Sequence, residues 1–286
     1  MPELPEVTAL VTDLGARLNG RTVQRLEMVS FAALKTFDPP VEALAGQAVT
    51  DVARHGKFLD ITIGGLHLVV HLALAGWIRW RDSDADRSKR PGRGLLAARL
   101  VLDDGSGFDV TEWGTKKSVA IWVVREPHDV PRIASLGPDP LAAGFTLEHF
   151  SSILSAAGRT QIKGVLRNQT LIAGIGNAYS DEILHAAKMS PFKPAAMPAE
   201  DSELLFLSMR KTLEGAIDRA DGLAASELKA EKKSGLKVHG RKGEPCPVCG
   251  DIVRQVNYTD SAFQYCPTCQ TGGKPLADRV LSRLLK

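Results

Sequence analysis

The sequence has few of the features that mark membrane, secreted or disulfide-bonded proteins. Only four cysteines occur in 286 residues, and none precedes Cys246. No run of about 18 uninterrupted apolar residues is present, so a membrane span is not expected. The N-terminus has no basic stretch followed by an apolar one, so no signal peptide is predicted. These absences predict a cytoplasmic protein with no membrane partner, and a monomer is the simplest expectation.

Aromatic residues and net charge are also low. Phe, Trp and Tyr together make up 6% of the chain, and the formal net charge is +3. The sequence pI of about 8.6 is weakly basic, which permits nucleic-acid binding without indicating it. Apolar content of 44% and charged content of 24% are ordinary for a globular protein. The length accommodates roughly two domains of about 100–200 residues.

The cysteines form the strongest local motif. Two C-x-x-C pairs, Cys246 with Cys249 and Cys266 with Cys269, are separated by sixteen residues. Such pairs supply four thiolates for one tetrahedral Zn²⁺ ion, and with no fifth ligand evident the site is predicted to be closed and structural. A redox dithiol pair is the alternative. The segment 252–265 between the pairs is expected to form a β-hairpin.

The N-terminus carries a second chemical signal. If Met1 is removed, Pro2 presents a secondary α-amine, and an α-amino group has a reference pKa near 8. A neutral amine attacks carbonyl-like carbons and forms a Schiff base. Glu3 and Glu6 supply two carboxylates for proton transfer. The simpler alternative is that Pro2 and Pro5 only restrict an exposed terminus.

The spacing of apolar residues divides the rest of the chain into helical and strand regions. Residues 5–20 carry apolar side chains at helical spacing, and short strand patterns between residues 21 and 126 predict a β-sandwich or barrel-like domain. Helical patterns follow Pro127. The charged stretch 82–94 is predicted to be a mobile loop. The lysine-rich stretch 222–244 is predicted to be a mobile connector that lies along nucleic acid or is simply solvated.

Two shorter motifs are ambiguous when taken alone. His55-Gly56-Lys57 places a lysine where it could reach an anion, although a turn glycine with an exposed lysine explains it equally simply. The glycine-containing loop that ends at Asn177 could present backbone N–H groups and the Asn177 amide to a phosphate. An ordinary structural turn is the competing explanation.

Five stretches together resemble the formamidopyrimidine-DNA glycosylase and endonuclease VIII family of bacterial base-excision repair enzymes. In chain order they are MPELPEV at 1–7, HGKFL at 55–59, GIGNAYSDEIL at 174–184, GRKGEPCPVCG at 240–250 and YCPTCQ at 265–270. The likeness runs over essentially the whole chain, and the first stretch is more similar to the formamidopyrimidine branch.

The resemblance implies an α+β multidomain fold. It comprises an N-terminal β-sandwich with an N-terminal helix, a helical helix–two-turn–helix domain and a C-terminal zinc-finger β-hairpin. The expected boundaries are 1–130, 131–235 and 236–286.

The resemblance also implies a bifunctional glycosylase and abasic-site lyase that acts on damaged double-stranded DNA, in the bacterial cytoplasm at the nucleoid. Base removal through a Pro2 Schiff base would be followed by β,δ-elimination, and one structural Zn²⁺ would be bound. The implied catalytic residues are Pro2, Glu3, Glu6 and Lys57. The implied DNA contacts are Lys57, Leu74, Lys116, Lys163 and Asn177.

The sequence departs from the family pattern at positions where the family recognises the damaged base. Leu74 stands where the family has a wedge methionine, and Lys116 and Ser118 stand near its Arg and Phe wedges. Trp113 could replace the missing aromatic ring or be an ordinary core or surface tryptophan. Ser261 replaces an arginine of the zinc hairpin. A non-enzymatic damage-binding protein and an unrelated zinc-ribbon module on a β-domain remain as alternatives, and the lesion stays open.

Overall fold

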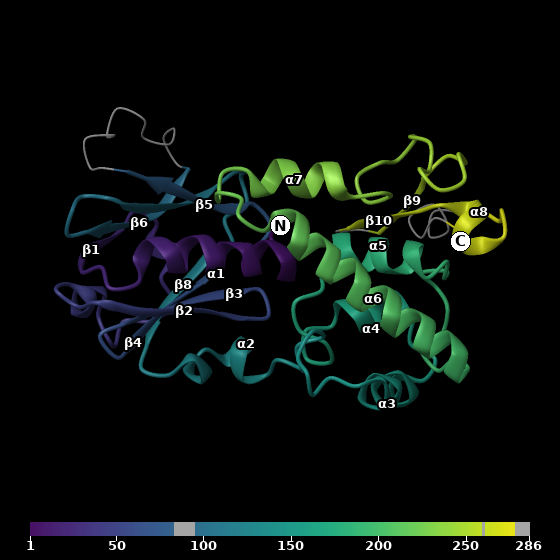
Figure 1. Cartoon of the computed structure of the whole chain (residues 1–286), viewed down its shortest axis with the longest axis horizontal. Helices are drawn as coiled ribbons and strands as arrows, with labels where there is room; N and C mark the ends of the chain where they lie inside the picture. Colours follow the sequence, from purple (N-terminus) through teal and green to yellow (C-terminus); the bar gives the residue numbers. More distant parts are fainter. Residues whose placement is uncertain (83–94, 259–260, 278–286) are drawn as a thin grey trace. The chain divides into compact units, whose positions relative to one another are not determined.

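The structure is a computed structural model that describes residues 1–82, 95–258 and 261–277. All but the first residue of the predicted loop 82–94 therefore lies outside the described residues. The chain forms two compact units, one of Met1–Leu136 with Arg219–Ala230 and the other of Gly137–Asp218 with Glu231–Lys286 (Figure 1). No helix in the described ranges combines the length and the apolar character needed to cross a membrane.

The first unit begins with helix α1 (Leu4–Leu18), which confirms the helical periodicity. Leu10, Leu14 and Leu18 are fully buried on one face, which packs against strands β2 (Val49–His55) and β3 (Phe58–Ile63). Pro5 lies in the first turn, where a missing N–H costs nothing. The helix thereby fixes the N-terminus against the sandwich.

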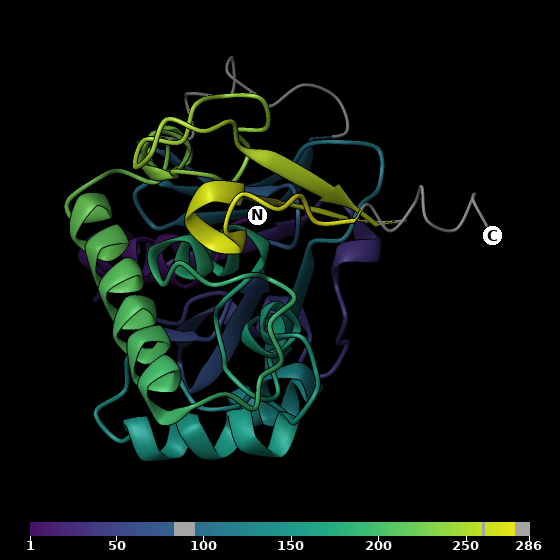
Figure 2. The same ribbon diagram turned by 90° about the vertical axis from the view of Figure 1, so that its right-hand side faces the viewer.

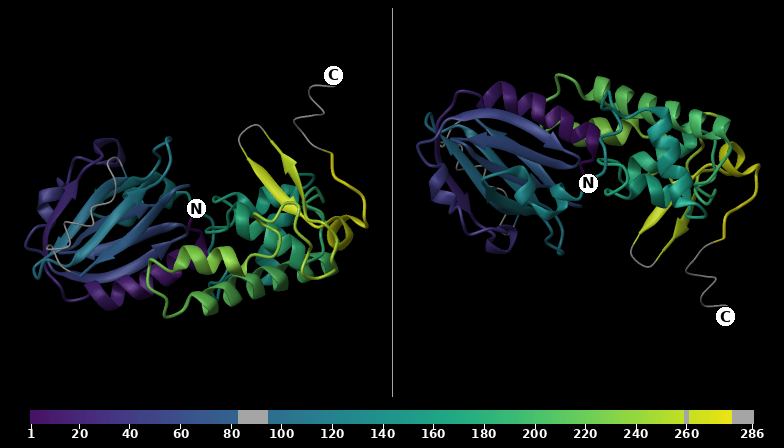
Figure 3. Two further views of the ribbon diagram at one scale, coloured as in Figure 1. Left: turned by 90° about the horizontal axis from the view of Figure 1, so that it is seen from above. Right: turned by 90° about the horizontal axis from the view of Figure 1, so that it is seen from below.

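Two four-stranded antiparallel sheets form the predicted β-sandwich (Figure 3). Apolar residues of their inner faces, among them Ile61, Leu100 and Val123, build a single core with α1. The first sheet has the order β1-β6-β7-β5 and the second β2-β3-β4-β8. The remaining strands are β1 (Val23–Met28), β4 (Leu66–His71), β5 (Gly76–Arg81), β6 (Leu96–Leu102), β7 (Gly107–Glu112) and β8 (Ala120–Val124).

Short helical segments complete the first unit. The 3-10 turns η1 (Phe31–Ala33) and η2 (Val41–Leu44) follow β1, and η4 (Pro127–Asp129) leads into the single-turn helix α2 (Pro131–Ala134). Ile133 of α2 packs with Phe58, Val69 and Trp122 in a small cluster on the second sheet, separate from the main core.

The second unit is built from helices and one hairpin (Figure 2). Its core includes Phe150 of α3 and Phe206 of α6, whose rings lie 5.7 Å apart. The elements are α3 (Leu147–Ala157), α4 (Ile162–Arg167), α5 (Asn177–Ala186), α6 (Ala199–Ala220), α7 (Leu228–Gly235), β9 (Arg254–Asn257), β10 (Ala262–Tyr265) and α8 (Pro267–Thr271). The chain passes from one unit to the other within α6 and again within α7. The α+β class with a sandwich, a helical domain and a C-terminal hairpin is confirmed.

The predicted mobile connector is instead structured. Residues 228–235 form α7, and the buried carboxylate of Glu182 accepts the backbone N–H groups of residues 237, 238 and 239 at 2.8, 2.9 and 2.8 Å. Burial raises the pKa of Glu182, and these three donors oppose that rise. This contact ties residues 237–239 to α5.

Candidate active site and metal centre

Pro2, Glu3 and Glu6 meet at the start of α1. Glu3 is the N-cap, and its backbone N–H donates to Glu6 Oε2 at 2.7 Å within a reciprocal capping box. Pro2 is buried, and Glu3 is only 2% exposed. The alternative of an exposed, merely restricted terminus therefore does not fit. Glu6 acts on the backbone of Glu3, and this contact fixes the peptide adjoining Pro2.

Lys57 lies in the two-residue turn between β2 and β3. Gly56 has φ +57°, a left-handed conformation that glycine adopts without strain, and His55 pairs with Phe58 across the turn. Lys57 is 8% exposed, so the alternative of a solvent-exposed turn lysine is wrong.

His71 lies beside Lys57 and was not among the predicted site residues. Burial, followed by the charges of Arg132 and Lys57, lowers the pKa of His71 to about 4. Its ring packs on Phe58 with the ring centroids 4.6 Å apart. The imidazole is therefore neutral at pH 7 beside two cations. Arg132, on α2, carried no sequence signal because only the fold brings it to this sheet.

The depressed pKa of His71 makes stability depend on pH. Between about pH 6.5 and 4 the unfolded chain binds a proton here that the folded chain does not, so stability falls as pH falls. From pH 7 to pH 4.5, wild type should lose about 2–3 kcal/mol more free energy of unfolding than His71→Gln. Urea denaturation at both pH values measures this difference. Equal losses in the two proteins would contradict it.

Leu74 and Trp113 lie at the same end of the first sheet. Gly76 pairs with Glu112, and the Trp113 N–H donates to the Ala75 carbonyl at 3.1 Å. Both apolar side chains face solvent, at 67% and 57% exposure. The turn before Leu74 places Ala73 at φ +50°, a conformation that costs a non-glycine residue on the order of 1–3 kcal/mol. The backbone thus holds two large apolar groups in water at one edge.

The segment after Trp113 is anchored at its base. The buried Glu112 carboxylate accepts the N–H groups of Ser118 and Val119 at 2.6 and 3.0 Å and the Ser118 hydroxyl at 3.2 Å. Ser118 therefore bonds within the protein although it is exposed, and Lys116, also exposed, lies within this segment. Glu112 is a positioning residue that the sequence did not reveal.

Lys163 of α4 is buried, which differs from its predicted role as a DNA contact. Its ammonium donates to Asp181 Oδ1 at 2.5 Å and to Ser180 Oγ at 2.6 Å, and the side chain is about 6% exposed. A paired, desolvated lysine cannot reach a phosphate without breaking this ion pair. Its position instead links α4 to α5.

Asn177 begins α5, after a loop in which Gly174 has φ +87°. Gln169 holds this loop by accepting the Gly174 N–H at 3.0 Å and donating to the Ile175 carbonyl at 2.7 Å. The Asn177 amide donates to the Ala262 carbonyl of β10 at 2.7 Å, and its buried Oδ1 has no hydrogen-bond partner within the described residues. The start of α5 is thereby attached to the hairpin.

The four cysteines converge as predicted. All four Sγ atoms lie within 4.8 Å of one another, with Cys249 and Cys266 at 3.3 Å and Cys246 and Cys269 at 3.9 Å. Tetrahedral Zn–S bonds of about 2.3 Å place sulfurs about 3.8 Å apart. The set therefore fits a tetrahedral thiolate-bound metal ion.

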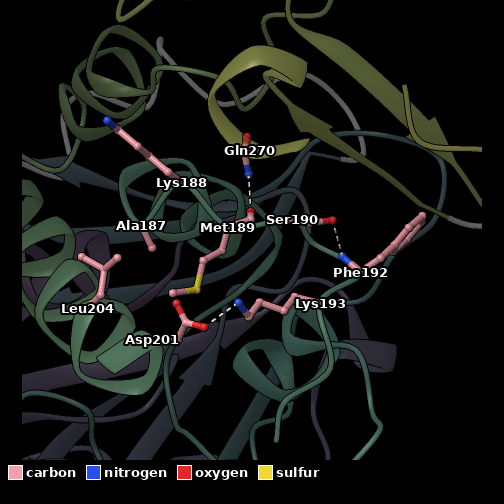
Figure 4. Close-up of a pocket in the computed structure, with 9 residues that line it drawn as sticks. All are labelled: Ala187, Lys188, Met189, Ser190, Phe192, Lys193, Asp201, Leu204 and Gln270. Atoms are coloured by element: carbon pink, nitrogen blue, oxygen red, sulfur yellow. Dashed lines mark hydrogen bonds and ion pairs between the residues drawn. The ribbon is translucent and has the colours of Figure 1, made fainter. Parts of the chain in front are cut away.

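A pocket of about 550 Å³ lies beside α5, α6 and α8 in the second unit (Figure 4). Its polar groups already pair with one another, since Lys193 bonds Asp201 at 2.7 Å and Gln270 Nε2 donates to the Met189 carbonyl at 2.9 Å. None of the predicted catalytic residues lines it. Gln270 also accepts the Cys266 N–H at 2.9 Å, so this contact secures the second cysteine pair.

Comparisons with known proteins agree with this architecture. Residues 1–113 match the model of the formamidopyrimidine-DNA glycosylase N-terminal domain, and residues 136–227 match that of its H2TH domain. An uncharacterised formamidopyrimidine-DNA glycosylase-like protein of Mycobacterium tuberculosis is 53% identical over 54% of this chain and 98% of its own length.

Two full-length matches extend the likeness. The formamidopyrimidine-DNA glycosylase of Symbiobacterium thermophilum is 35% identical over 94% of this chain and 89% of its own. The Lactococcus lactis enzyme in complex with abasic-site DNA superposes with a TM-score of 0.82 at 26% identity, covering 94% and 99% of the two chains. The chain therefore belongs to the formamidopyrimidine-DNA glycosylase family of DNA base-excision repair enzymes.

Proposed function

We propose that this protein is a bifunctional glycosylase and abasic-site lyase that removes an oxidised base from double-stranded DNA. The observation that carries the proposal is the buried Pro2-Glu3 pair at the capped start of α1, in a chain of this family. A secondary amine beside a carboxylate in a water-poor site is suited to Schiff-base chemistry.

The reaction follows from this pair. After removal of Met1, the Pro2 nitrogen bonds to C1′ of the damaged nucleotide while the bond from C1′ to the base breaks. The base leaves with that electron pair and takes a proton. Glu3 exchanges protons with the sugar, and Glu6 holds the Glu3 backbone. The nitrogen then loses its proton and the bond from C1′ to O4′ breaks, with O4′ taking a proton from Glu3, which leaves an iminium between Pro2 and C1′. The iminium acidifies C2′, and successive β- and δ-eliminations release the two flanking phosphates.

DNA contacts are assigned from the family resemblance and from position in the fold. Lys57 and Asn177 contact backbone phosphates, and Lys116 adds a cation near the first-sheet edge. Lys163 is a positioning residue through its ion pair with Asp181. One Zn²⁺, held by Cys246, Cys249, Cys266 and Cys269, orders the C-terminal hairpin on which Asn177 rests.

Leu74 and Trp113 fill the space left when the damaged nucleotide leaves the stack. Stacking of a base on an aromatic side chain contributes about 1–3 kcal/mol. Trp113→Ala should therefore lower kcat/KM on a base-lesion duplex about 5- to 100-fold. The loss should be smaller on an abasic duplex, because no base has to be extruded. Phe37→Ala, at another exposed aromatic of this unit, is the matched control. Equal losses on both duplexes would refute this role.

Borohydride trapping on a panel of duplexes tests the proposed function. The panel holds an abasic site, 8-oxoguanine, a formamidopyrimidine, an oxidised pyrimidine and uracil. Covalent trapping on abasic DNA and on at least one base lesion is the expected result. Tight binding to damaged duplex with no trapping on any member would instead establish the damage-binding alternative, which the altered wedge positions Lys116 and Ser118 motivate.

A further inference from the structure

His185 is a buried histidine that the proposed chemistry does not use. It lies on α5, is 3% exposed, and its Nε2 is 3.3 Å from the Sγ of Cys246. The two residues are 61 positions apart in the chain, so this contact is made by the fold. It joins the helix that begins with Asn177 directly to a predicted metal ligand.

The chemistry of the pair sets the direction of the hydrogen bond. A metal-bound cysteine is a thiolate, which has no proton and can only accept. His185 Nε2 must therefore carry the hydrogen, which selects the Nε2–H tautomer of a neutral imidazole.

The hydrogen bond stabilises negative charge on the cysteine sulfur. Four thiolates around one Zn²⁺ leave a net charge of −2, and hydrogen-bond donors stabilise it. The backbone N–H groups of Asp251 and Cys269 donate to the sulfurs of Cys249 and Cys266. Cys246 is the most deeply placed ligand of the first pair, at 2% exposure, and receives a side-chain donor from a different element.

His185 is held in position by neighbouring contacts on α5. Four residues before it, Asp181 Oδ2 accepts the Gln264 N–H at 3.1 Å and bonds His239 Nδ1 at 2.7 Å. The carboxylate of Glu182, three residues before it, accepts hydrogen bonds from the backbone N–H groups of residues 237–239. These contacts attach α5 to both sides of the cysteine cluster, so the imidazole meets Cys246 in a fixed geometry.

We infer that His185 is a positioning residue for the metal centre, donating a hydrogen bond to the Cys246 thiolate that slows the loss of zinc. This inference rests on the proposed zinc site. Partners that orient and stabilise metal ligands typically change metal affinity about 10- to 100-fold.

Zinc transfer from the purified full-length protein to the chromogenic chelator 4-(2-pyridylazo)resorcinol tests the inference. His185→Phe keeps a ring but removes the donor, and it should release zinc at least about 10-fold faster than wild type. His185→Gln places an N–H near the same point and should stay within about threefold of wild type. His149→Phe, at an exposed histidine on α3, controls for the substitution itself.

Cobalt substitution gives a second readout. Loss of the donor should shift the thiolate-to-Co²⁺ charge-transfer band of His185→Phe to longer wavelength, with the band of His185→Gln unshifted. If His185→Phe does not fold, His185→Asn replaces it, because its shorter amide cannot reach Cys246 and the same acceleration is expected.

The outcomes separate this inference from the zinc proposal. Purified wild type without zinc would overturn both. About one zinc per chain, with release from His185→Phe within twofold of wild type, would overturn the inference alone. Equal acceleration by the Phe and Gln variants would also overturn it, because packing would then explain the effect.

Discussion

Replacing Pro2 by glycine should lower strand cleavage at an abasic site by at least about 100-fold and abolish most borohydride trapping. Proline presents a secondary amine that forms an iminium directly, whereas glycine presents a primary amine on a flexible backbone. Glycine also leaves empty the buried site that the proline ring fills. Single-turnover cleavage of an abasic duplex, followed by gel separation of the trapped complex, measures both quantities.

Pro5→Ala is the matched control for this substitution. Pro5 lies in the first turn of α1 and presents no amine, and alanine is well tolerated there. Its cleavage rate should stay within about threefold of wild type, since helix propensity is the main property that changes. Wild-type trapping by Pro2→Gly would remove Pro2 from the mechanism and leave another amine to be found.

Replacing the buried Cys266 by serine should abolish stoichiometric zinc binding and weaken binding to an abasic-site duplex by at least about 10-fold. A serine hydroxyl is not a thiolate, and three sulfurs cannot close the tetrahedral set. The hairpin β9–β10 has few apolar residues of its own, chiefly Val256, Phe263 and Tyr265. Without the metal it should lose its hold on Asn177, whose amide bonds Ala262. Metal analysis and fluorescence anisotropy test these two effects.

Val248→Ala controls for disturbance of the cysteine loops. Val248 lies between two ligands but is exposed and donates nothing to the site, so one zinc and wild-type affinity are expected. Thermal unfolding adds a further check, because the β-sandwich has its own core and should unfold cooperatively in Cys266→Ser. A metal-free Cys266→Ser protein with unchanged DNA affinity would refute the structural role of the metal.

The features that could be predicted from sequence are those whose chemistry is local. The paired C-x-x-C spacing requires the sulfurs of each pair to lie close together, whatever the rest of the chain does. The start of α1 follows from Pro5, which suits a first helical turn, and from the apolar periodicity after it. Many short strand patterns at close spacing likewise predicted a sandwich or barrel-like domain, because so many short strands are typical of those folds.

Lys163 shows where sequence reasoning failed. Lys163 was predicted to contact DNA, but the structure pairs it with Asp181, eighteen residues later in the chain. The connector 222–244 failed for a similar reason. Its lysine-rich composition is typical of a mobile segment, yet Glu182 secures it through three backbone amides that composition does not reveal.

The sequence alone thus indicated the candidate reactive groups, which are the Pro2 amine with its carboxylates and the four thiolates, together with α1 and the strands. The tertiary structure decided which charged side chains are buried and which are exposed to solvent. It buried Lys57 beside His71, paired Lys163, exposed Leu74 with Trp113, and brought His185 to Cys246. The physical reason is the distance along the chain between interacting groups. Hydrogen-bonded turns and the spacing of metal ligands depend on residues only a few positions apart. Burial and ion pairing depend on partners far away in the chain, which only the packed fold selects.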